Sequence, residues 1–147
     1  MSEHDLTQRA LFPVWSETTV RYSDLDPNSH VNNGAISAYF EDGRVRLRAE
    51  HLATASNAML TGFAIARITI NYRAPLTFPA TVDIGSAVTR IGNSSYVLGQ
   101  SVFRGDECIA TAEVVTVRFD AKSHRSMPLE DEVRAVLATV AAPGALA

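Results

Sequence analysis

The chain of 147 residues is 46% hydrophobic and 20% charged, and its formal net charge at pH 7 is −3. A chain of this length forms one domain whose core needs no disulfide or metal to support it. The composition excludes a disordered, collagen-like or coiled-coil protein, and the charge excludes the basic surface typical of nucleic-acid partners. A single cysteine excludes an internal disulfide and favours a reducing compartment. The sequence shows no signal-peptide pattern and no apolar run of about 20 residues, so we expect a soluble, cytoplasmic protein without a membrane span.

Two patterns precede residue 60 and predict a strand followed by one long helix. Val14–Tyr22 alternates between faces, which is typical of a half-buried strand. Turn-forming residues then fill positions 23–30. The range Asn33–His51 has apolar residues at helical spacing and predicts the helix. Its apolar positions are Ile36, Phe40, Gly43 and Leu47. Glycine is costly inside a helix, so Gly43 predicts the close approach of another backbone.

After residue 62 the apolar residues recur with a spacing of two, which predicts four further strands. Their ranges are 63–73, 82–88, 96–103 and 108–119. The short connections at Gly92-Asn93 and Gly105-Asp106 predict antiparallel hairpins. Adjacent Val114 and Val115 interrupt the last alternation and indicate either a bulge or burial on both faces.

The last predicted element is a short amphipathic helix that opens at Pro128 and Leu129, with acidic residues in its first turn. One domain is expected over residues 14–140, with flexible ends at 1–13 and 141–147. Five antiparallel strands and one long helix make an α+β domain, and a single helix leaves much of such a sheet uncovered. We therefore expect the chain to self-associate.

The residues most suited to chemistry lie just before the predicted long helix: Asp24, Asp26, Asn28 and His30. If this stretch is extended, the last three alternate and project to one side. The helix start at Asn33 offers unpaired N–H groups and a partial positive charge, which suit a developing oxyanion. A carboxylate beside such donors can attack a carbonyl or deprotonate a water, as acyl transfer to water requires. Aspartates before a helix are also common turn formers and caps, and spacing leaves both interpretations open.

Other reaction types find little support in the sequence. A metal site from Asp24, Asp26 and His30 lacks further histidines or cysteines at ligand spacing, so no metal is expected. Cys108 stands in a strand pattern and is expected to be a buried small hydrophobe rather than a nucleophile. Ser94-Ser95 lacks the pattern that surrounds a serine-hydrolase nucleophile.

Longer runs of sequence carry a family resemblance. Residues 20–33 read VRYSDLDPNSHVNN, and residues 39–44 read YFEDGR. These runs closely resemble the hot-dog-fold acyl-CoA thioesterases of the 4-hydroxybenzoyl-CoA thioesterase type, whose members read R-x-x-D-x-D, H-V-N-N and Y-x-E-x-A-R. Softer matches are INYRAP at 70–75, GNSSY at 92–96 and VRFD at 117–120. The first run also resembles plant acyl-ACP thioesterases, which read D-L-D-x-N-x-H-V-N-N.

The resemblance implies a role for four residues. Asp26 matches the catalytic carboxylate, which acts as nucleophile or general base, and Asn33 matches the position whose backbone N–H polarises the thioester carbonyl. Asn28 and His30 match the active-site network of the plant enzymes and would orient Asp26 or the water. The plant enzymes also use acidic or cysteine residues after the helix, which this chain lacks between positions 52 and 72.

The resemblance further implies a single hot-dog domain, in which an antiparallel five-stranded sheet wraps around one long central helix and a short C-terminal helix follows. Such a hydrolase would cleave an acyl thioester of coenzyme A, or of acyl carrier protein, to free acid and thiol. Coenzyme A would enter only as part of the substrate, so no cofactor is expected. Two copies would pair edge to edge, as a homodimer or within a homotetramer, with active sites at their interface.

Two alternatives to a thioesterase stay open at this point. A hot-dog enoyl-CoA hydratase carries its acidic, amide and histidine residues as D-x-N-x-x-H, whereas this chain reads D-x-N-x-H from Asp26 to His30. A non-enzymatic acyl-CoA-binding hot-dog protein would bind its ligand without turnover.

Overall fold

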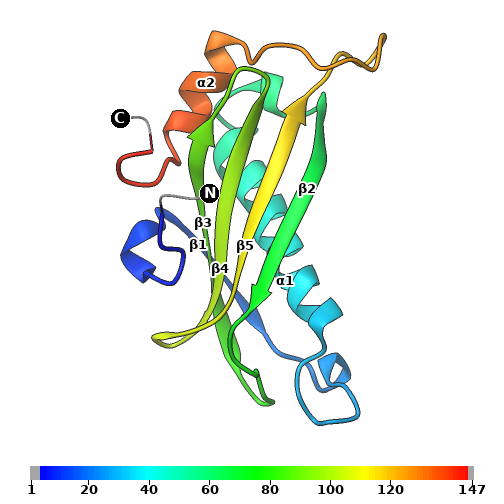
Figure 1. The fold of residues 1–147 in the computed structure, drawn as a ribbon, viewed down its shortest axis with the longest axis vertical. Helices are drawn as coiled ribbons and strands as arrows, with labels where there is room; N and C mark the ends of the chain where they lie inside the picture. The colour runs from blue at the N-terminus through cyan, green and yellow to red at the C-terminus, as the bar shows by residue number, and fades with distance from the viewer. Residues whose placement is uncertain (1–3, 146–147) are drawn as a thin grey trace.

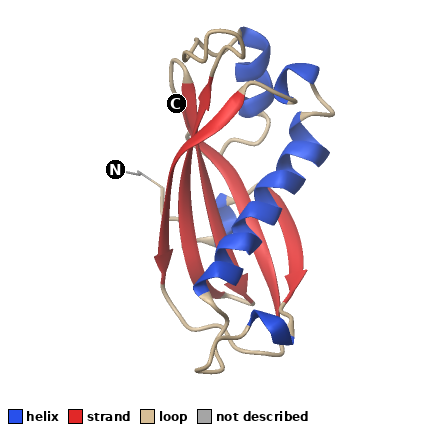
Figure 2. Ribbon diagram, turned by 90° about the vertical axis from the view of Figure 1, so that its right-hand side faces the viewer, coloured by secondary structure: helices blue, strands red, loops and turns tan. Residues whose placement is uncertain are grey.

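The fold is a five-stranded antiparallel sheet packed against one long helix, and the computed structural model describes it over residues 4–145. The strands lie in the spatial order β1-β3-β4-β5-β2. Their bounds are Val14–Thr19 for β1, Phe63–Tyr72 for β2, Thr81–Ile91 for β3, Ser95–Arg104 for β4 and Glu107–Arg118 for β5. The long helix α1 (Asn33–Leu47) crosses one face of the sheet, and α2 (Asp131–Ala138) lies at one end (Figures 1 and 2). This arrangement confirms the predicted α+β architecture.

Helix α1 packs on the sheet through the apolar residues that its sequence spacing predicts. Its buried residues are Ile36, Tyr39, Phe40, Gly43 and Leu47. Its polar face carries an ion pair between Asp42 and Arg46, at 2.8 Å. The helix continues into a π-helical turn, Arg48–Leu52, so the predicted end near His51 is confirmed.

Gly43 lies where α1 comes closest to β3. A Cβ atom at this position would stand 2.7 Å from Cγ2 of Ile84. The group that approaches Gly43 closely is therefore a side chain, whereas the sequence predicted another backbone. Beside it, the fully buried amide of Gln100 donates to the Phe40 carbonyl at 3.1 Å and to the Ser86 hydroxyl at 3.0 Å. Because both of its N–H groups are satisfied, this buried amide ties α1 to β3 and β4 without an uncompensated polar group.

Two sequence predictions about element boundaries are wrong. The first strand ends at Thr19, because residues 22–24 form the 3-10 helix η2 (Tyr22–Asp24), and the Tyr22 side chain is 77% exposed. Helix α2 begins at Asp131, since the backbone N–H of Leu129 instead binds the carbonyl of Asn93 at 2.8 Å. A third prediction concerns Val114 and Val115, for which the sequence allows a bulge or burial on both faces: the register shift opposite them lies in β2, between residues 65 and 67, while Val114 is buried and Val115 is half-buried.

The two ends of the chain pack on the face of the sheet opposite α1 (Figure 1). Leu6 and Phe12 form a small core there with Phe103 and Ala142. The backbone of Ala142 also donates a hydrogen bond to Val88 of β3 at 2.8 Å. Residues 1–13 and 141–147, which the sequence predicts to be flexible, are thus packed against the sheet over much of their described length.

The contact at Gly43 predicts a stability effect. In Gly43→Val the added side chain must displace Ile84, which is 1% exposed and has no free space to enter. The free energy of unfolding in urea should fall by about 1–3 kcal/mol. Ala38→Val, on the exposed face of α1, is the control and should cost only about 0.5 kcal/mol through helix propensity. Equal stability of Gly43→Val and the wild-type protein would contradict this contact.

Candidate active site

The loop before α1 folds back on itself around Asp26. The backbone N–H of Asp26 donates to the carbonyl of His30 at 2.8 Å, and Leu25 forms a β-bridge with Val31. One carboxylate oxygen of Asp26, Oδ1, accepts the backbone N–H groups of Asn28 at 2.8 Å and His30 at 3.2 Å. Asp26 is therefore a turn former, as the plainer interpretation of the sequence holds, yet this role uses only one of its two oxygens.

This turn overturns one expectation about the loop. The stretch is not extended, because Ser29 has a φ of 63° and the chain reverses between positions 26 and 30. Asp26, Asn28 and His30 therefore do not project to one side by simple alternation. Asn28 and His30 do hold Asp26 in place, but through their backbone N–H groups.

The start of α1 has one backbone donor without a partner. Asn32 caps the helix: its side-chain Oδ1 accepts from Gly34 N at 2.6 Å, and its carbonyl accepts from Ala35 at 2.9 Å and Ile36 at 3.1 Å. The N–H of Asn33 makes no hydrogen bond within residues 4–145. At a helix N-terminus such a free donor adds to the positive end of the helix dipole.

A cavity of about 300 Å³ brings three of the four predicted site residues together. Asp26, His30 and Asn33 line it, whereas Asn28 does not. Its remaining walls are Val31 and Ile36 and residues 72–76, at the end of β2 and in the loop that follows. The backbone N–H of Val31 binds the Leu76 carbonyl at 2.8 Å, and this bond holds the β2–β3 loop against the loop of Asp26.

Sequence reasoning did not assign Tyr72 and Arg73 to the site. Both line the cavity, although they lie about forty residues along the chain from Asn33. The INYRAP match at 70–75 is the signal that points to them, because it falls where the strand ends.

Asp24 anchors the site loop to α1. Its carboxylate is 6% exposed, accepts the Tyr39 hydroxyl at 2.6 Å and the Arg21 backbone N–H at 3.0 Å, and lies 3.3 Å from the Arg21 guanidinium. Burial by itself raises the pKa of Asp24, but these hydrogen bonds and the charge of Arg21 outweigh it and lower the pKa. Burial and the neighbouring Asp24 carboxylate raise the pKa of Tyr39, so its hydroxyl remains a donor. Asp24 thus supports the site and does not line its cavity.

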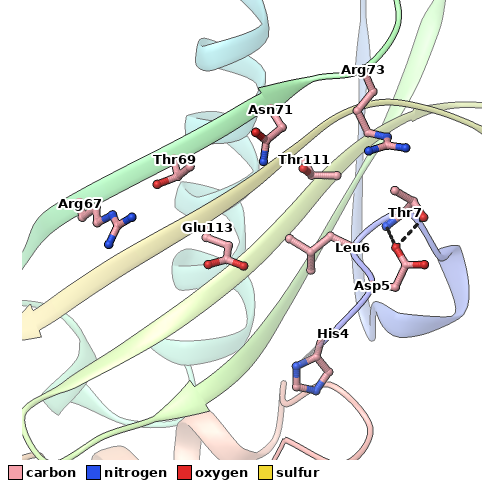
Figure 3. A pocket seen from close by; sticks show the side chains of 10 residues that line it. All are labelled: His4, Asp5, Leu6, Thr7, Arg67, Thr69, Asn71, Arg73, Thr111 and Glu113. Carbon is pink, nitrogen blue, oxygen red and sulfur yellow. Dashed lines mark hydrogen bonds between the residues drawn. The ribbon is translucent and has the colours of Figure 1, made fainter. Parts of the chain in front are cut away.

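Other groups do not form a comparable site. A second cavity, of about 340 Å³, lies on the sheet face opposite α1, and Arg67, Glu113 and Asp5 give it mixed charge (Figure 3). Of the cavity residues near Asp26, only Arg73 lines both cavities. Burial raises the pKa of the half-buried Cys108 thiol, which disfavours a nucleophilic thiolate. Among the described residues, no three His, Cys, Asp or Glu side chains are grouped to hold a metal ion, and no helix is long and apolar enough to span a membrane.

Comparisons with known proteins identify the family. The model of the thioesterase-like superfamily matches residues 20–137, which is most of the chain. The chain therefore belongs to the thioesterase-like superfamily, its fold is the hot-dog fold, and it is an enzyme of the thioester-hydrolase class.

Individual relatives agree with this membership. The long-chain acyl-CoA thioesterase FadM of Escherichia coli (strain K12) is 29% identical over 125 residues, covering 81% of this chain and 92% of FadM. A thioesterase from Thermus thermophilus, solved with coenzyme A and Zn, is 29% identical with a TM-score of 0.77, over 88% of this chain and 94% of that one. YbaW, a probable thioesterase from Escherichia coli, is 25% identical with a TM-score of 0.74, over 86% and 97%.

The environment of Asp24 predicts a pH-dependent contribution to stability. Its pKa in the folded protein is lower than the ordinary aspartate value of 3.8, so its stabilising effect is full above about pH 4 and is lost as the pH falls through the folded-state pKa. Asp24→Asn should therefore lower the free energy of unfolding at pH 7 by about 1–3 kcal/mol. The gap between variant and wild type should shrink toward pH 3.

Urea denaturation at pH 7, 5 and 3 measures this gap. Asp42→Asn is the control, because its carboxylate is 44% exposed and paired only on the surface of α1. A gap at Asp24 that stays constant across this range would contradict the assignment.

Proposed function

We propose that this protein hydrolyses an acyl-CoA thioester in the cavity at the start of α1. One observation carries the proposal: Asp26 and Asn33, whose N–H has no hydrogen-bond partner within residues 4–145, line the same cavity. The similarity to FadM, a long-chain acyl-CoA thioesterase, and to a thioesterase solved with coenzyme A supports this substrate class. Acyl carrier protein is the second candidate for the thiol carrier.

The proposed reaction uses these two groups in turn. The thioester carbonyl oxygen accepts the Asn33 N–H, which stabilises the negative charge that develops on that oxygen. Asp26 either attacks the carbonyl carbon itself or takes a proton from a water that attacks it. If Asp26 attacks, the carbon–sulfur bond breaks as an acyl–Asp26 anhydride forms, the thiolate of coenzyme A leaves and is protonated, and water then hydrolyses the anhydride to the free acid and the Asp26 carboxylate. If water attacks, the carbon–sulfur bond breaks directly, and the proton that Asp26 has taken goes to the leaving thiolate.

The loop before α1 positions the Asp26 carboxylate. The N–H groups of Asn28 and His30 fix Oδ1. Within residues 4–145 no hydrogen bond occupies Oδ2, so this oxygen is left for the substrate or the water. His30 also lines the cavity, and in this proposal its side chain orients the water, whereas Asn28 contributes its backbone N–H.

The outer edge of β2 is the proposed surface for a second copy of the chain. On the α1 side this strand exposes Ile65 (46%), Ile68 (42%) and Tyr72 (47%), and it pairs only with β5 in the described chain. An unpaired apolar edge of this kind favours association with another strand. Because Tyr72 also lines the cavity, a partner on this edge would complete the active site and give a homodimer.

The first test of this function replaces the carboxylate. Asp26→Asn keeps the side-chain shape and removes the nucleophile or base, so kcat should fall by roughly 10²- to 10⁴-fold. Release of free thiol from a panel of acyl-CoA substrates measures the effect. Loss of enoyl absorbance without thiol release would identify a hydratase instead, and tight acyl-CoA binding without turnover would identify a binding protein.

A second test concerns the partner copy. Ile68→Asp places a charge in the exposed apolar row, so the variant should be largely monomeric at micromolar concentrations where the wild type is a dimer or tetramer. Sedimentation equilibrium measures this, and Asn71→Asp, on the other face of the same strand, is the control. A wild-type monomer with full acyl-CoA turnover would contradict a site completed by two chains.

A further inference from the structure

Two aromatic rings stand in solvent near the cavity. Tyr22 is 77% exposed and Phe78 is 43% exposed, and their ring centroids lie 5.8 Å apart with an interplanar angle of 74°. The two rings thus form a contiguous exposed apolar patch, which is more informative than a single exposed apolar side chain. The pair is therefore a candidate binding surface.

The position of the pair connects it with the active site. Tyr22 precedes Asp26 by four residues, a stretch of chain that spans at most about 14 Å. Phe78 follows Leu76, a wall of the cavity, by two residues. The loops that carry the two rings lie together at the end of the molecule where α1 begins (Figure 1). The two rings therefore lie on the loops that also supply walls of the cavity.

Two arginines lie beside the loops that carry the two rings. Arg21 directly precedes Tyr22, and its side chain is 78% exposed. Arg104 donates to the Thr77 hydroxyl at 3.1 Å, directly before Phe78, and pairs with Glu107 at 2.7 Å. Guanidinium groups of this kind bind phosphate oxygens through paired N–H donors.

The geometry selects one kind of occupant. Two rings near a right angle present the face of one and the edge of the other, which together form a corner for a single planar ring. Two side chains cover far less than the roughly 800 Å² that each partner buries in a stable protein interface. A purine base fits this corner, because base–aromatic stacking needs only one ring face.

We propose that the Tyr22–Phe78 pair binds the adenine ring of coenzyme A, with the exposed guanidinium of Arg21 contacting its phosphates. This inference rests on the proposed function, which places the thioester of the same molecule in the cavity. It identifies the nucleotide-bearing carrier, coenzyme A, as the substrate form that this end of the molecule recognises.

Binding of the nucleotide alone tests the proposal without hydrolysis. Titration calorimetry with adenosine 3′,5′-bisphosphate compares the wild type, the double variant Tyr22→Ala/Phe78→Ala, and Tyr22→Phe/Phe78→Tyr, which keeps both rings. The alanine variant should bind about tenfold more weakly, and the aromatic variant should match the wild type. Equal affinity of all three proteins, or no binding by the wild type, would overturn the proposal.

Kinetics supply the second measurement. An acyl-CoA is compared with the same acyl group on pantetheine, which lacks the nucleotide. The alanine variant should raise KM for acyl-CoA about tenfold with kcat unchanged, and leave both parameters for acyl-pantetheine unchanged. An equal loss on both substrates would show a structural role, and a selective loss on an acylated carrier protein would show a protein occupant; either overturns the proposal. A wild type that hydrolyses neither substrate contradicts the proposed function, and nucleotide binding then decides the inference alone.

Discussion

The incomplete capping of α1 is the feature on which the proposed chemistry depends. Asn32 satisfies the N–H groups of Gly34, Ala35 and Ile36 and leaves that of Asn33 without a partner in the described chain. If every N–H group at the start of α1 were hydrogen-bonded, the helix would offer the substrate no donor. Without the Asn32 cap, the first turn of the helix would be less stable. The hydrogen bonds that fix the helix start therefore also create the position at which a carbonyl oxygen can be stabilised.

The loop before α1 has to hold Asp26 as firmly as the cap holds the helix start. Two hydrogen bonds made by buried residues fix this loop. Asp24 binds the Tyr39 hydroxyl inside α1, and Val31 binds the backbone of Leu76 in the β2–β3 loop. Between these anchors the turn at Asp26 commits one carboxylate oxygen to the backbone. The two aspartates of the loop thus differ in place: Asp24 holds the loop to α1, and Asp26, the proposed catalytic carboxylate, lines the cavity.

Sequence periodicity predicted the parts of the fold that depend on local burial. Phe40 and Leu47 recur at helical spacing because one face of α1 lies on the sheet, and the hairpin turns followed from short glycine-containing connections. Turn-forming residues at 23–30 indicated the loop before α1, but the sequence did not decide between a turn and an extended stretch at Asp26, because an aspartate accepting nearby backbone N–H groups competes with extended structure. Tyr72 was missed for a different reason, since its place in the cavity depends on how β2 meets a loop distant in sequence.

The most direct test of the central claim is a crystal structure with a non-hydrolysable acyl-CoA in which a methylene group replaces the thioester sulfur. We expect the ketone oxygen at about 2.7–3.1 Å from the Asn33 nitrogen, with Asp26 facing the carbonyl carbon. A ketone bound in the cavity away from Asn33, with its oxygen held by other donors, would contradict the proposed role of the helix start.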